Sequence, residues 1–128
     1  MGNITNVGKN LMRDEVQGVT TDAQIKYIAW GDNNTANPDP NNLTQLYNEL
    51  GRHAVTSRTA GGVGILDTII YLAPADAVAG IKEIGLFAGA AATAAANSGI
   101  MVTRFLYDKN KLATESIQVV QTDTFTEA

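Results

Sequence analysis

Apolar residues that alternate or run together from residue 54 onward constrain the fold more than any other feature. Between Gly64 and Leu72 they alternate so that both faces of an extended strand are partly apolar. This pattern is typical of a strand covered on two sides, and a neighbouring subunit is one source of such a cover. The expected strands are Ala54–Arg58, Gly64–Leu72, Ile81–Phe87, Ile100–Tyr107 and Ala113–Gln121, with Gly61-Gly62 as the turn between the first two.

The residue pattern in the N-terminal part of the chain predicts a short, weakly indicated helix and one further strand. Within Asn6–Val16 the apolar residues have roughly helical spacing, and Gly18 is suited to end the helix. The run Ala23–Trp30 is rich in β-branched and aromatic residues, which favour a strand. Gly31 and Asp32 follow it directly, so the strand is expected to end in a turn.

A short capped helix is predicted after a polar loop. The segment Asp32–Asn42 consists almost entirely of Asp, Asn, Thr and Pro, which form ordered turns and not a linker. Asn42 can cap a helix, and Gln45 stands at the position of a capping-box partner. The apolar residues between Leu43 and Leu50 would form one buried stripe on this helix.

The alanine-rich run Ala88–Gly99 lacks a large apolar residue that could anchor a helix, so we expect a long loop. Such a loop is either a mobile hairpin tip or a segment ordered by a neighbouring subunit. Phe125 near the C-terminus is either a docking residue or part of a frayed end. The candidate subunit-interface residues are Trp30, Ala91, Ala94, Asn97 and Phe125.

Length and composition fit one domain over residues 1–128. Because the N-terminus lacks the regions of a signal peptide, we expect synthesis in the cytoplasm. The nine Lys and Arg residues are scattered singly and the formal net charge is −4, so direct contact with nucleic acid is not expected. The chain has no cysteine, which excludes disulfides and thiolate chemistry. No apolar run approaches the roughly 20 residues that span a bilayer, and no signal peptide is evident, so no membrane partner is expected.

Residues that could carry chemistry are few and isolated. His53 is the one histidine, and a structural role is expected for it. Asp32 and Asp39 lack the spacing of a calcium loop, and Gly61–Gly64 precedes a strand instead of the helix that a phosphate cradle requires. We therefore predict no catalytic residue, no metal ligand, no cofactor and no enzyme activity.

Four short segments occur in an order that resembles a known family. They are Ile28-Ala29-Trp30-Gly31-Asp32 followed by a Pro-containing loop, Leu46 with Asn48-Glu49 and Arg52, Glu83-Ile84-Gly85-Leu86-Phe87, and Gly99-Ile100-Met101-Val102-Thr103-Arg104. The series resembles the N-terminal domain of phage tail-collar fibre proteins and related small phage virion proteins, from about Ala23 to Tyr107. Two departures are that such a fibre usually continues into a long shaft, whereas this sequence stops at Ala128, and that the alanine-rich run replaces a tight polar turn.

The resemblance implies a virion subunit, made in the host cytoplasm, that attaches to other virion proteins and carries no catalytic residues. We expect a mainly β fold, an antiparallel β-sandwich or partly open barrel with one short capped α-helix and a weaker N-terminal helix. The expected function is a tail, collar or fibre-attachment subunit, and a capsid decoration (cement) or head-fibre protein is the alternative. The expected partners are tail, collar or major capsid proteins and further copies of the chain, with a trimer by analogy with fibres.

A carbohydrate-binding module is the rival from another class. In that reading Trp30 and the loop Asp32–Asn42 would stack against a host sugar. An enzyme is the third class, and His53 would be its minimal candidate.

Overall fold

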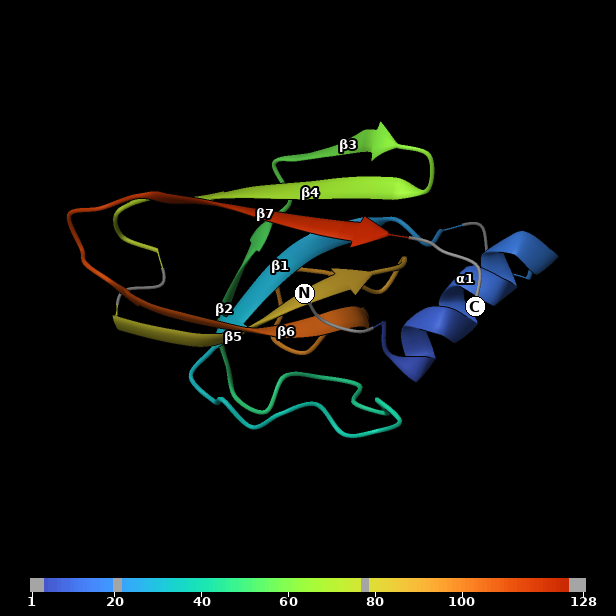
Figure 1. Ribbon diagram of the computed structural model, residues 1–128, viewed down its shortest axis with the longest axis horizontal. Coiled ribbons are helices and arrows are strands. Elements are labelled where there is room, and N and C mark those ends of the chain that lie inside the picture. Colours follow the sequence, from blue (N-terminus) through green and yellow to red (C-terminus); the bar gives the residue numbers. More distant parts are fainter. Residues whose placement is uncertain (1–3, 20–21, 77–78, 125–128) are drawn as a thin grey trace.

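In the part of the chain that the structure describes, two antiparallel sheets and one helix make up the fold, which confirms the predicted mainly β, sandwich-like class (Figure 1). The structure is a computed structural model that describes residues 4–19, 22–76 and 79–124. One sheet has the order β2-β1-β5-β6 and the other the order β3-β4-β7. The elements are α1 (Asn6–Gln17), β1 (Ile25–Gly31), β2 (Glu49–Ala54), β3 (Ser57–Gly62), β4 (Ile65–Leu72), β5 (Ala79–Ala88), β6 (Ile100–Lys111) and β7 (Ile117–Thr124).

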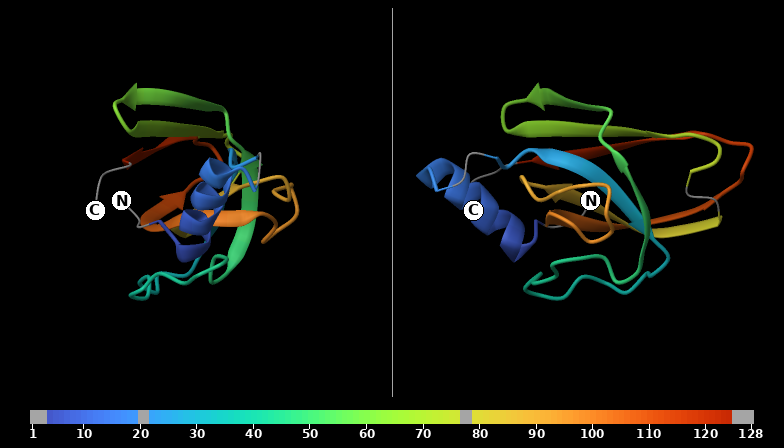
Figure 2. Two further views of the ribbon diagram at one scale, coloured as in Figure 1. Left: turned by 90° about the vertical axis from the view of Figure 1, so that its right-hand side faces the viewer. Right: turned by 180° about the vertical axis from the view of Figure 1, so that it is seen from behind.

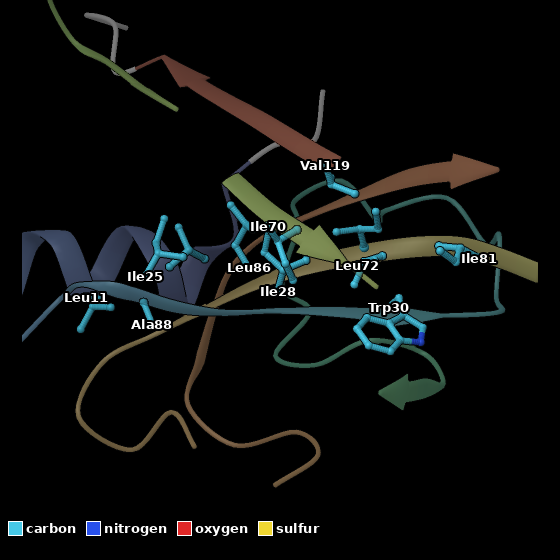
Figure 3. Packing of buried hydrophobic residues seen from close by; sticks show 12 residues of the cluster. Leu11, Ile25, Ile28, Trp30, Ile70, Leu72, Ile81, Leu86, Ala88 and Val119 are labelled. Carbon is cyan, nitrogen blue, oxygen red and sulfur yellow. The ribbon is translucent and has the colours of Figure 1, made fainter. Parts of the chain in front are cut away.

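The main core lies between the two sheets. Alternation along each strand sends one set of side chains inward, so Ile28 of β1 and Leu86 of β5 meet Ile70 of β4 and Val119 of β7 (Figure 3). Ile70 and Leu86 have no exposed surface. Trp30 is only 9% exposed and belongs to the same cluster.

The other face of the four-stranded sheet is covered by the chain's own loops. Segment 32–48 runs along this side of the sheet, away from the three-stranded sheet (Figures 1 and 2). Beneath the loops lies a second small core made of Ala29, Leu46, Phe87 and Met101. Gly85 lies among these residues, and a Cβ added to it would sit 2.9 Å from Leu46 Cδ2. The segment is therefore packed as part of the fold.

Helix α1 lies at one end of the sandwich beside β6 (Figure 2). Thr5 caps its N-terminus, because its Oγ1 accepts a hydrogen bond from Gly8 N at 3.0 Å. Gly18 ends the helix with a left-handed φ of 85°. Leu11 is buried against the core. The N-terminal helix and its glycine stop are confirmed as the sequence predicts.

The predicted capped helix after Asn42 is wrong. Residues 43–48 form an irregular segment, and β2 begins at Glu49. The N–H groups of Tyr47 and Asn48 are bound by the carboxylate of Glu83 instead of by helical carbonyls. Leu46 fills the second core while Leu50 is exposed, so the apolar stripe does not share one face.

Other boundaries shift by a few residues. The expected strand Ala54–Arg58 is divided between β2 and β3, which are separated by Val55 and Thr56. The turn between β3 and β4 is formed by Val63-Gly64, two residues later than predicted. Here Gly64 has a φ of 69°, which a glycine adopts without strain.

Candidate functional site

A buried ion pair connects strands β5 and β6 on the face of the four-stranded sheet that the loops cover. Glu83 of β5 and Arg104 of β6 lie 2.8 Å apart, Oε1 to Nε, and neither side chain has exposed surface. The same carboxylate accepts hydrogen bonds from Tyr47 N and Asn48 N, both at 3.0 Å. Three donors therefore satisfy the buried charge, which would otherwise be expensive to bury.

Arg104 uses its remaining donors to hold the polar loop. Its guanidinium donates to Thr35 O at 2.8 Å and to Asn33 O at 3.1 Å. Asn37 makes two hydrogen bonds with Arg104: its Oδ1 accepts from Arg104 Nη1, and its Nδ2 donates to Arg104 O. The ordered loop predicted from Asx and Pro content is confirmed, and its organiser is an arginine distant in sequence.

A second ion pair holds the alanine-rich loop. Arg52 of β2 binds Glu49 at 2.7 Å, and both side chains are almost fully buried. Arg52 also stacks 4.3 Å from the centre of the Phe87 ring and donates to Thr93 O and Ser98 O. Glu49 and Arg52 both lie on strand β2 and reach across to the loop. The described loop is thus held by contacts within the chain itself.

The predicted interface residues fall in three different environments. Ala91, Ala94 and Asn97 are exposed on the loop between β5 and β6, where Asn97 has a φ of 62° and donates its N–H to Glu49. Trp30 lies in the core and leaves little surface for a subunit or for a stacked sugar. Phe125 lies outside the described residues.

The outer face of the three-stranded sheet carries apolar residues of β4, the strand that the sequence predicts to be apolar on both faces, together with Val120 of β7. Ile69 of β4 lies directly opposite Val120 of β7, and both point away from the core because Ile70 and Val119 point into it. Tyr71 is 47% and Val120 is 52% exposed. No described segment packs over this face (Figures 1 and 2). We call Ile65, Ile69, Tyr71 and Val120 the outer apolar patch. Asp67 of β4 lies on the same face between Ile65 and Ile69, and its Oδ1 accepts a hydrogen bond from Thr122 Oγ1 of β7.

The inner face of the same sheet contains an unusual polar group. Asp123 is 5% exposed, and its Oδ2 has no hydrogen-bond partner among the described residues. Burial raises the pKa of its carboxyl, and the hydrogen bond from Gln121 Nε2 at 3.1 Å opposes this change. Thr68 Oγ1, on the neighbouring strand β4, is also buried and lacks a partner within the described chain.

Chemistry-bearing side chains do not converge in the described residues. His53 lies exposed on β2, with its Nε2 4.0 Å from Asp76 Oδ2. Within residues 4–19, 22–76 and 79–124, no group of three or more His, Asp or Glu side chains is placed to hold a metal ion. In the same ranges no helix has the length and apolar character needed to cross a bilayer.

Comparison of the chain with protein-family models, with curated proteins and with solved structures finds no match in any of the three. The candidate functional site is therefore inferred from the structure of this chain and not from a related protein. Its clearest feature is the outer apolar patch on β4 and β7.

Proposed function

We propose that the chain is a non-enzymatic structural subunit of a phage virion, of tail, collar or fibre-attachment type, that acts by protein–protein assembly. The observation that carries this proposal is the outer apolar patch. The four-stranded sheet has its core on one face and its own loops on the other, whereas the three-stranded sheet leaves one face uncovered. Exposed apolar sheet surface of this kind is typical of a face that another protein covers.

The segments that carry the family resemblance support the proposal through their positions. Glu83 and Arg104 form the central ion pair, and Gly31 allows the close approach of Asn48 and Glu83 beside it. Arg52 fixes the loop that follows β5. These residues stabilise the fold and hold two surface loops in place, and a particle subunit acts through the surface that it presents to its neighbours.

The direct test is to look for the chain in particles. Virions produced by the genome that encodes it would be purified, analysed by mass spectrometry and labelled with a gold-conjugated antibody against the chain. We expect the chain at a fixed stoichiometry and the label at one site on the tail or collar. Absence of the chain from intact particles would refute the proposal.

A surface variant tests the role of the patch. Tyr71→Lys places a charge in the patch and is expected to reduce incorporation into particles about tenfold or more, because the ammonium would lose water at the contact. Leu112→Lys is the matched control, since Leu112 is 58% exposed but lies on the connection between β6 and β7. Equal incorporation of both folded variants would exclude the patch as the contact.

A further inference from the structure

The four strands at the sheet margins differ in how their free edges are protected. Strand β2 has an irregular register with β1 near Leu50, and β3 has one with β4 near Gly61. Strand β6 is partly covered, because Ile4 forms a bridge to Thr103 and α1 packs beside it. Bulges and covering segments of this kind prevent further strand pairing.

Within the described residues strand β7 has no bulge and no covering segment, and the inward-pointing carboxyl of Asp123, next to the last residue of the strand, is its one protective feature. It pairs with β4 in continuous register from Ile117 to Thr124, and its second edge pairs with no described strand. The strand contains no proline, lysine, arginine or glutamate. Its exposed side chains are neutral, and its one charged residue, Asp123, points to the buried face. A regular, neutral edge is a template for another strand.

The lack of exposed charge on β7 makes this edge the place where two copies can meet. The chain has a formal net charge of −4, so two copies repel each other over most of their surface. At β7 neither copy presents an exposed charge. An antiparallel strand edge is also complementary to itself across a two-fold axis, because every second residue directs its N–H and C=O to the free edge and can exchange hydrogen bonds with the same strand of the other copy.

We propose that β7 pairs antiparallel with β7 of a second copy about a two-fold axis at Val120, which joins the two three-stranded sheets into one. This register places Val120 opposite Val120 of the second copy and extends the cross-strand pair with Ile69 into one apolar row. A register centred on Gln121 would instead place Val120 opposite Thr122. The inference deepens the proposed assembly function, and it makes a two-fold dimer the first unit in place of the trimer expected by analogy with fibres.

The chain lacks cysteine, so a single introduced cysteine reports only contacts between copies. Directly opposite residues in an antiparallel pair have Cα atoms about 4.5 to 5.5 Å apart, within the range that a disulfide spans. Val120→Cys is therefore expected to form a disulfide-linked dimer under mild oxidation at least about tenfold faster than Val63→Cys. Val63 is the matched control because it is fully exposed at the β3–β4 turn.

A second cysteine position tests the register. In the proposed pairing Gln118 faces Thr122 of the second copy, and the two Gln118 residues lie roughly 14 Å apart along the strand. Gln118→Cys is expected to cross-link no faster than Val63→Cys. Faster linkage at position 118 than at position 120 would overturn the register.

Sedimentation of the purified chain separates this inference from the assembly function. We expect a reversible dimer whose dissociation constant rises about tenfold or more in Val120→Lys, because two ammonium groups would then lie opposite each other. A chain that is monomeric alone but present in virions would overturn the β7 dimer and leave the assembly function standing. A chain absent from virions yet dimeric through position 120 would refute the assembly function and support the dimer.

Discussion

Replacing Glu83 tests its ion pair with Arg104, in which neither side chain has exposed surface. Its carboxylate receives hydrogen bonds from Arg104 Nε, Tyr47 N and Asn48 N, and its side chain has no exposed surface. Glu83→Gln keeps the shape of the side chain but removes the charge and turns one acceptor into a donor. The amide NH₂ would then face a backbone N–H or the guanidinium, and Arg104 would remain as a buried cation without its counterion.

The expected loss of stability is large. Breaking one partner of a buried ion pair costs about 3 to 5 kcal/mol of unfolding free energy. For a chain of this size such a loss lowers the melting temperature by about 10 °C or more. Arg13→Ala is the control, because Arg13 is 64% exposed in its pair with Asp14, and exposed pairs contribute less than about 1 kcal/mol.

Urea unfolding is followed through the fluorescence of Trp30, the single tryptophan, which lies in the core. The double variant Glu83→Gln/Arg104→Met should lose at least about 1 kcal/mol less than the sum of the single losses, because the charges depend on each other. A loss below about 1 kcal/mol for Glu83→Gln, or strict additivity in the double variant, would refute this description of the pair.

Further expectations concern packing, pH and the loop. Gly31→Ala should destabilise the chain by about 3 kcal/mol or more in urea unfolding, because an added Cβ overlaps a backbone oxygen and lies 2.9 Å from a buried carboxyl carbon. Gly80→Ala, with open space around it, should change stability little, and equal losses would contradict the packing. Asp123 has a raised pKa in the fold, so its neutral form is favoured there and stability should fall as pH rises through that pKa. Asp123→Asn should therefore be more stable than the parent at neutral pH and lose this advantage in acid, whereas an advantage independent of pH would contradict the assignment. Arg52→Ala should speed amide hydrogen exchange at Asn97, and unchanged exchange would show that the loop is held otherwise.

The β-rich class could be predicted because its signal is local. Alternation in β4 and β7 records which side chains face the core, and the N-terminal helix carries its own stop at Gly18. The helix predicted after Asn42 could not be rejected in the same way. Its capping pattern is genuine, but Glu83, far away in sequence, binds the N–H groups that a helix would use.

The candidate site was harder to predict for a related reason. The sequence pointed to the Ala88–Gly99 loop because of its composition, yet Arg52 ties that loop to its own chain. The apolar residues of β4 were recognised as two-sided, but period-two alternation does not say which face the rest of the chain leaves open. Only the positions of the loops and of the second sheet place Tyr71 on an uncovered face.

Footprinting of the outer apolar patch in the particle tests the assembly account most directly. Hydroxyl radicals would label the free chain and the intact virion, and mass spectrometry would measure modification at Tyr71, with Leu112 as an exposed reference. The account predicts strong protection of Tyr71 relative to Leu112 once the chain is in the virion. Equal labelling of Tyr71 in the free and assembled states would contradict the claim that another protein covers this face.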